Sequence, residues 1–324
     1  ETFNNLTINK PGATLTVANS DTMIVTGTLT LTDGSINQTT IPATGSVEAQ
    51  GGVSHASTFD GGTGLLLIDG AATRTINLTG GGELPAVTLN AANVTLNGPS
   101  SGTTTFEGAF TLQAGSFNGG AGAIDFSSTF TQSGGTFTGG AGTVTVTGNF
   151  SQSGGTFTGG TTTTFNGDTT ISAGTFNAGT TTTFGNAGTD TFTLSGTGTF
   201  NAANTVTFTA DATVSGGTFA GGSATLDFND DFTLSGGTFT ASSGTTSFAG
   251  NFTHTAGGTF SHNSGTVVFD GGGDATADVA TSETFNNLTI NKPGATLTVA
   301  NSDTMIVTGT LTLTDGSINQ TTIP

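Results

Sequence analysis

Phenylalanine recurs in this chain at intervals close to 20 residues, and this spacing restricts the possible folds more than any other feature. The Phe that ends a phrase such as Gly-Thr-Phe returns at gaps of 20, 20, 19, 24, 19, 20 and 21 residues. This first column consists of Phe117, Phe137, Phe157, Phe176, Phe200, Phe219, Phe239 and Phe260. A second column with nearly the same gaps consists of Phe106, Phe126, Val146, Phe165, Phe184, Phe208, Phe228, Phe248 and Phe269. A third, looser column holds Phe110, Phe130, Phe150, Phe232 and Phe252.

Each period holds about three short strands in which apolar and polar residues alternate, as Val144 and Val146 do with their threonine neighbours. Gly-Gly or Ser-Gly-Gly corners separate these strands. Such short strands cannot bury a face alone, but they can when they are coiled into rungs that stack about 4.8 Å apart. A β-sandwich has no such period, and a propeller blade needs about twice the length. The spacing therefore predicts an all-β fold, a β-solenoid with about 20 residues and three short strands per rung, in which the Phe columns form ladders inside.

The chain also contains one perfect long repeat. Residues 1–42 recur without a single change at residues 283–324, an offset of 282. We therefore expect tandem copies of a 282-residue unit, with residues 1–282 as one full unit and residues 283–324 as the start of the next identical one. Within the unit, regular 20-residue rungs are expected over about 100–270, a loop excursion over about 43–63, and an inserted loop near 185–190. Because the chain begins at Glu1 and shows no signal-peptide pattern, we expect it to be a fragment.

Composition excludes several classes of partner. The formal net charge is −18, and the only basic side chains besides histidine are Lys10, Arg74 and Lys292. Nucleic acids and anionic membrane surfaces need clustered Lys or Arg, so neither is expected to bind. The absence of cysteine removes disulfides, thiolate metal sites and thiol nucleophiles. No 18-residue apolar run exists, so this segment is not expected to insert into a membrane.

Catalytic and metal-binding residues are sparse. Asp125 and Asp227 fall in one outward column but about 24 Å apart at the stacking distance, so paired acid–base chemistry is not expected and the chain is not predicted to be an enzyme. A weak calcium candidate consists of Asp270, Asp274 and Asp278, although these residues are better explained as solvated acidic corners. His254 and His262 lie within one rung without an obvious third ligand and are expected to be half-buried corner residues. No other cofactor is expected.

Threonine arrays at residues 161–164 and 180–183 are superficially similar to ice-binding surfaces. Threonine is, however, the usual outward residue of a solenoid strand, so the arrays are expected to be ordinary strand surface.

The phrases TFNNLTIN at residues 2–9 and VTGTLTLT at residues 25–32 resemble the repeats of very large bacterial cell-surface and secreted proteins. The 20-residue rungs are similar to the right-handed β-helices of filamentous-haemagglutinin-type adhesins and autotransporter passengers. The resemblance implies a right-handed solenoid on the bacterial surface, but it does not define one function, because such solenoids serve as adhesins, enzymes and stalks.

Two functions remain open at this point. The first is a structural role in an extracellular bacterial fibre, filament or surface stalk, in which identical repeat units stack end to end, either in one chain or as subunits joined by strand exchange. The alternative is an adhesin that binds a carbohydrate or host receptor through surface loops at 43–63 and 185–190. The perfect 42-residue identity favours the fibre, because the repeats of adhesins are usually imperfect.

Overall fold

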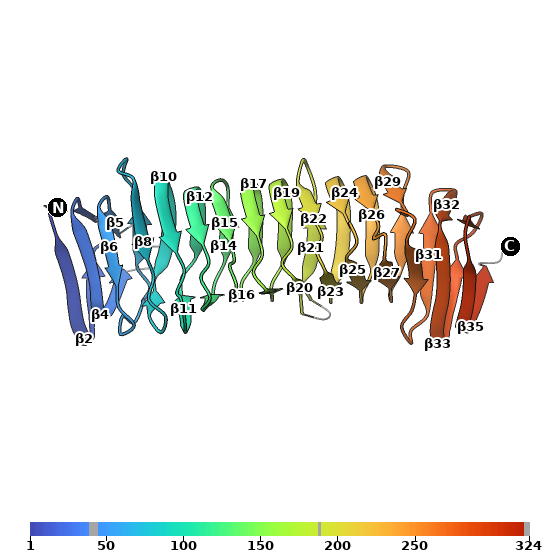
Figure 1. The fold of residues 1–324 in the computed structure, drawn as a ribbon, viewed down its shortest axis with the longest axis horizontal. Helices are drawn as coiled ribbons and strands as arrows, with labels where there is room; N and C mark the ends of the chain where they lie inside the picture. The colour runs from blue at the N-terminus through green and yellow to red at the C-terminus, as the bar shows by residue number, and fades with distance from the viewer. Residues whose placement is uncertain (39–44, 187–188, 321–324) are drawn as a thin grey trace. The chain divides into compact units, whose positions relative to one another are not determined.

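The computed structural model describes residues 1–38, 45–186 and 189–320. It divides the chain into two compact units, residues 1–163 and residues 164–324. Each unit is a stack of coils built from parallel strands, and the described residues contain no helix (Figure 1). The prediction of an all-β solenoid is therefore confirmed, whereas its right-handed sense stays a prediction.

The strands of the first unit are short, and most span two to five residues. They are β1 (Thr2–Phe3), β2 (Leu6–Val17), β3 (Thr22–Val25), β4 (Thr28–Gln38), β5 (Ser46–Ala49), β6 (Gly52–His55), β7 (Leu65–Ile68), β8 (Arg74–Asn77), β9 (Glu83–Leu84), β10 (Ala86–Asn97), β11 (Thr103–Phe106), β12 (Phe110–Asn118), β13 (Ala123–Phe126), β14 (Phe130–Gln132), β15 (Thr136–Thr138), β16 (Thr143–Val146) and β17 (Phe150–Thr158). Strand β18 (Thr162–Phe165) lies at the division between the units.

The second unit repeats this arrangement. Its strands are β19 (Thr169–Asn177), β20 (Thr181–Phe184), β21 (Thr191–Leu194), β22 (Thr199–Asn201), β23 (Thr205–Phe208), β24 (Asp211–Ala220), β25 (Thr225–Phe228), β26 (Phe232–Thr240), β27 (Thr245–Phe248), β28 (Phe252–His254), β29 (Gly258–Ser261), β30 (Thr266–Phe269), β31 (Ala275–Val279), β32 (Ser282–Phe285), β33 (Asn287–Val299), β34 (Thr304–Val307) and β35 (Leu311–Gln320).

Three parallel ladders, here called faces 1, 2 and 3, run along the coils of the first unit. Phe residues in register define each face: Phe110, Phe130 and Phe150 on face 1, Phe117, Phe137 and Phe157 on face 2, and Phe106 and Phe126 followed by Val146 on face 3. Because each residue pairs with its counterpart one coil later, the 20-residue spacing of the sequence becomes the spacing of the coils.

The same three faces are recognisable in the second unit, because the phrase Phe-Thr-Leu-Ser-Gly-Gly-Thr-Phe at residues 232–239 matches residues 130–137 at seven of eight positions. Face 1 carries Phe192, Ala212, Phe232 and Phe252; face 2 carries Phe176, Phe200, Phe219, Phe239 and Phe260; face 3 carries Phe184, Phe208, Phe228, Phe248 and Phe269.

The Phe ladders are buried and stacked, as predicted. Ring centroids of Phe137 and Phe157 lie 4.7 Å apart at an interplanar angle of 8°, and those of Phe208 and Phe228 lie 4.5 Å apart at 2°. Every Phe of the chain is buried except Phe3 and Phe260. The prediction is wrong in this respect for Phe260, which is only half-buried on β29.

Some threonines expected on the surface lie inside the coils. Thr163 and Thr182, taken from the two threonine arrays, are fully buried. Each hydroxyl accepts a hydrogen bond from a corner N–H, from Gly160 to Thr163 and from Gly179 to Thr182, both at 2.9 Å. A buried hydroxyl can thus replace an aliphatic side chain where it satisfies a corner amide.

The predicted excursion at 43–63 is wrong for most of its length. Residues 43 and 44 lie outside the described residues, but β5 and β6 lie within this segment and pair in register with β3, β4 and β7. Phe59 then points into the core, so the segment forms a regular coil. In the predicted loop at 185–190, residues 187 and 188 lie outside the described residues, and the Asn186 N–H donates to Asp190 Oδ2 at 2.8 Å.

Candidate functional site

The join between the two copies of the repeat is the feature of this chain with the clearest functional meaning. The first copy ends at residue 282, and β32 (Ser282–Phe285) runs across the join without a break. The next strand, β33, pairs with β30 and β31 of the first copy, so Ile290 lies in register with Phe269 and Leu297 with Ala275. The ladders through β30 and β31 therefore continue into the second copy, whereas β32 pairs with β34 in a separate two-stranded sheet.

The hydrophobic core also continues through the join. Phe285, the third residue of the second copy, is fully buried, and its ring centroid lies 5.6 Å from that of Phe260 and 6.2 Å from that of Phe269. Leu288, Ile290 and Leu297 are buried behind it. A copy of the repeat thus supplies the apolar surface that the end of the preceding copy needs.

A buried lysine joins the two copies through backbone carbonyls. The Nζ of Lys292 donates to the carbonyl oxygens of Ala249 at 3.0 Å and Asp270 at 2.5 Å, and the residue is 0% exposed. Burial lowers the pKa of Lys292, while Asp270 and Asp274 partly oppose this shift. The identical residue of the first copy, Lys10, is exposed. The difference shows that the preceding coils, and not the local sequence, bury this lysine.

Substitution of Lys292 by alanine should destabilise the second unit by about 1–3 kcal/mol, because two buried carbonyls lose a charged donor. Lys10→Ala removes the same side chain from the same sequence and should change stability by less than about 0.5 kcal/mol. Urea unfolding of both variants measures the difference. Equal effects of the two substitutions would contradict the role given to Lys292.

Polar side chains add further links across the join. His254 Nδ1 and Glu283 Oε2 form a hydrogen bond in which both side chains are largely buried. The Val279 N–H donates to Asp303 Oδ2 and the Thr296 N–H donates to Asp274 Oδ1, both at 2.8 Å. The sequence periodicity did not single out these pairs.

The histidines do not form a metal site with each other. His254 Nδ1 is hydrogen-bonded to Glu283 Oε2, whereas His262 Nδ1 accepts a hydrogen bond from the Ser264 N–H at 2.9 Å within its own turn. Each histidine therefore has a local structural partner.

The structure gives no support to the calcium candidate. Asp274 is engaged with Thr296, Asp278 is exposed on β31, and the side chain of Asp270 is close to Ser247 and Asp227. Within residues 1–38, 45–186 and 189–320, no three His, Asp or Glu side chains lie together in a way that could hold a metal ion.

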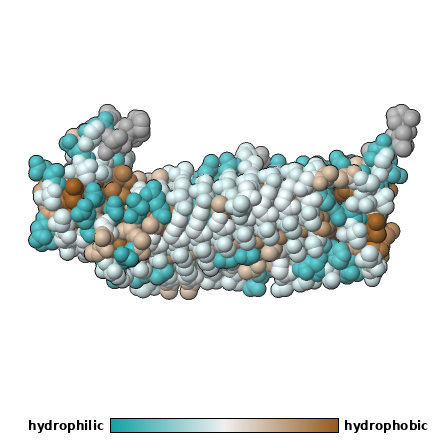
Figure 2. Space-filling view, turned by 90° about the horizontal axis from the view of Figure 1, so that it is seen from above, coloured by the Kyte–Doolittle hydropathy of each residue, from teal (hydrophilic) through white to brown (hydrophobic). Residues whose placement is uncertain are grey.

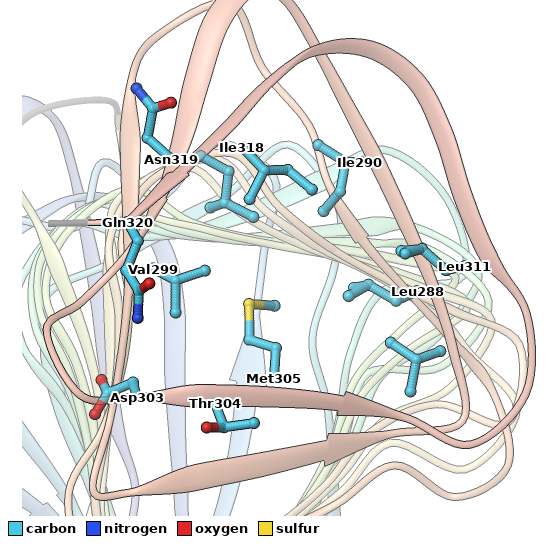
Figure 3. A pocket seen from close by; sticks show the side chains of 12 residues that line it. Leu288, Ile290, Val299, Asp303, Thr304, Met305, Leu311, Ile318, Asn319 and Gln320 are labelled. Carbon is cyan, nitrogen blue, oxygen red and sulfur yellow. The ribbon is translucent and has the colours of Figure 1, made fainter.

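The last described strands leave an apolar surface open. Leu311 and Ile318 are 50% and 46% exposed, and with Leu288 and Met305 they line the hollow shown in Figure 3. Leu313, which is 65% exposed, lines a second hollow beside Ile318. Apolar atoms are visible at this C-terminal end, whereas the middle coils show mostly side chains of intermediate hydropathy (Figure 2). The identical residues of the first copy, Leu29, Leu31 and Ile36, are 0% exposed beneath the next coil.

The two copies start on different faces of their coils. In the first unit, Phe3 begins face 1, because its ladder passes through Val25, Ala49, Ile68 and Leu89 to Leu112. In the second unit, face 1 passes from Phe252 through Ala277 to Val299, which is position 17 of the repeat instead of position 3. In the face numbering of each unit, equivalent positions of the two copies therefore differ by one face.

An acidic cluster in the first unit makes stability depend on pH. Burial raises the pKa of Glu83, and the neighbouring carboxylates of Glu107 and Asp60 raise it further. Burial also raises the pKa of Asp125, Asp211 and Asp270. A carboxyl group whose pKa is raised in the folded state lowers the free energy of unfolding when it is ionised. This loss of stability disappears as the pH falls through the folded pKa towards about 4. Burial lowers the pKa of His55. This residue therefore lowers the stability of the fold as the pH falls below about 6.5, which is opposite to the effect of the carboxyl groups.

Glu107→Gln isolates the carboxyl contribution, because His55 is the same in both proteins. In the wild type, Glu107 Oε2 accepts a hydrogen bond from the Gly62 N–H at 2.6 Å. The amide oxygen of the variant can accept the same hydrogen bond. Its Tm should exceed that of the wild type by about 2 °C at pH 7 and equal it at pH 4. Calorimetry at four pH values between 4 and 7 tests this, and a difference that does not vary with pH would refute it.

No helix formed by the described residues is long and apolar enough to cross a membrane. No protein-family model matches the chain, and neither the curated proteins nor the solved structures compared with it give a significant match. The fold and the join alone define the class: a tandem-repeat β-solenoid protein.

Proposed function

We propose that this chain is a segment of a structural protein that forms an extracellular bacterial fibre or surface stalk from tandem 282-residue solenoid repeats. The observation that carries the proposal is the join at residues 282 and 283. Strand β32 spans this join, the buried core continues through it, and Lys292 of the second copy binds a backbone carbonyl of the first, with no linker between the copies. A protein whose repeats join in this way can extend by adding copies. The low content of charged residues and the absence of cysteine suit a durable extracellular material.

The offset of one face gives the proposed fibre a specific symmetry. Each added copy would begin one face further around the coil, which is one third of a turn when the twist of the stack is left aside. Three repeats would therefore restore the starting face. At about 4.8 Å per coil, a repeat of 13 to 14 coils would lengthen the fibre by about 65 Å.

Electron microscopy of proteins with one, two, three and four tandem repeats tests the proposal. The expected result is a set of straight rods whose length increases by about 65 Å per repeat. In a second experiment, antibodies against this chain should label filaments outside the producing cells. Separate globules joined at flexible points would contradict the fibre. A finite rod with a non-repetitive tip on the native protein would instead favour an adhesin.

A further inference from the structure

One of the three ladders is interrupted at the join between the copies. On face 2, β29 (Gly258–Ser261) pairs with β26, and the strand that crosses the join in the next coil is β32. Strand β32 pairs with β34, in a two-stranded sheet that is separate from the large sheet containing β29. Within residues 258–285, all of which the structure describes, no backbone pairing therefore joins β29 to β32.

The phenylalanine rings change their arrangement at the same place. Elsewhere on face 2, the rings of Phe200 and Phe219 are stacked, with centroids 4.6 Å apart and an interplanar angle of 23°. The rings of Phe260 and Phe285, on either side of the interruption, lie 5.6 Å apart at an angle of 64°. The rings still touch across the join, but they have lost the stacked arrangement that accompanies a paired ladder.

The side chain of Glu283 satisfies the backbone at this interruption. The Phe285 carbonyl accepts a hydrogen bond from the Thr308 N–H of the following coil at 3.0 Å. Since successive residues of a strand direct their backbone groups to opposite sides, the Thr284 N–H points away from that coil, towards the interruption. Glu283 Oε1 accepts this N–H at 3.0 Å. A carboxylate oxygen therefore takes the place of the missing strand partner.

The other oxygen of this carboxylate reaches the preceding copy. Glu283 Oε2 is hydrogen-bonded to Nδ1 of His254, which ends β28 in the coil before the join. The side chains of Glu283 and His254 are only 8% and 13% exposed. Burial of a carboxylate is costly unless it is hydrogen-bonded, so His254 and the Thr284 N–H together hold Glu283 in this position.

We propose that the hydrogen-bonded pair of Glu283 and His254 is a latch, which closes the interrupted face and keeps the solenoid from bending open at the join. This inference rests on the proposed function, because a latch in every repeat would determine where the fibre bends. Faces 1 and 3 cross the join through the pairing of β31 and β30 with β33, whereas face 2 depends on side chains at this point. Loss of the latch should therefore open face 2 while the other two faces stay paired.

Hydrogen–deuterium exchange of the Glu283→Ala variant tests the latch within this chain. Amides of β29 and β32 should exchange about tenfold faster than in the wild type or more, because the hydrogen bonds that close the interruption are lost. Amides of β33 should change by less than about twofold, because its ladders do not use the latch. Equal rates in variant and wild type, or an acceleration of the same size in β29, β32 and β33, would overturn the proposal.

Ile290→Ala is the matched control on a paired ladder of the same join. Ile290 is buried and lies in register with Phe269. Its loss removes packing from face 3, so exchange should accelerate mainly in β30 and β33 and not in β29 and β32. The two variants together distinguish local opening of face 2 from a general loss of stability at the join.

Electron microscopy of a four-repeat protein tests the consequence for the fibre. With alanine at Glu283 and at the equivalent residue of every later join, the rods should bend at intervals of about 65 Å, whereas rods with the latch intact stay straight. Straight rods from the variant would refute the latch and leave the fibre intact. Separate globules from the four-repeat protein with its latch intact would instead refute the fibre itself.

Discussion

Phe208→Ala is expected to destabilise the second unit by about 3–5 kcal/mol, the range for removal of a fully buried aromatic ring. The Phe208 ring is 0% exposed and stacks between Phe184, at 5.1 Å, and Phe228, at 4.5 Å. Its loss leaves a cavity in face 3 that neighbouring coils can close only by giving up their own register. Guanidinium unfolding followed by circular dichroism measures the effect.

Phe260→Ala is the matched control for this substitution. Phe260 belongs to a ladder as well, but it is half-buried, and its ring lies 5.9 Å from that of Phe239. We expect it to cost less than half as much as Phe208→Ala, because less apolar surface is lost. If the two variants were equally stable, stacked rings would not be the main source of stability.

Gly217→Ala is expected to cost about 3 kcal/mol or more, through two separate effects. Gly217 has a φ of +68°, which disfavours any side chain, and an added Cβ would lie 2.2 Å from the carbonyl oxygen of Gly198 in the preceding coil. The corner could accept the methyl group only if the coils moved apart, which would weaken the ladders on both sides.

Two other glycines separate the effects. Gly222 has a φ of +55° but its nearest atom to an added Cβ is 3.7 Å away, so Gly222→Ala should cost about 1 kcal/mol from backbone strain alone. Gly273 has no atom within 4 Å of an added Cβ and no positive φ, so Gly273→Ala should be neutral or slightly stabilising. Equal losses at Gly217 and Gly222 would show that close stacking of the corners is unimportant.

The regular coils could be predicted because the sequence shows both the alternation of apolar and polar residues and the 20-residue period. Both patterns arise because each strand buries one of its two sides. The coil at residues 46–64 could not, since strands such as Ser46–Ala49 contain small and charged residues and owe their place to pairing with β3 and β7. Thr163 and Thr182 were misplaced for a related reason: threonine is common on both sides of these strands, and only the corner amides identify the buried hydroxyls.

The join could be predicted only in outline. Exact repetition indicated that one copy follows another, but Lys292 binds backbone carbonyls, which leave no sequence signature. The pairing of His254 with Glu283 links residues 29 positions apart, a separation that differs from the 20-residue period. The extracellular fibre, its bacterial origin and any ligand remain predictions from the repeat and the resemblance.

Hydrogen–deuterium exchange across the join tests the central claim most directly. If the solenoid core passes from one copy to the next, backbone amides of β33 should exchange as slowly as those of β25 and β27, deep in the second unit, because all three strands are paired on both sides and packed on buried side chains. Rapid exchange of β33, after slowly exchanging segments in β25 and β27, would show an interrupted core and contradict the account.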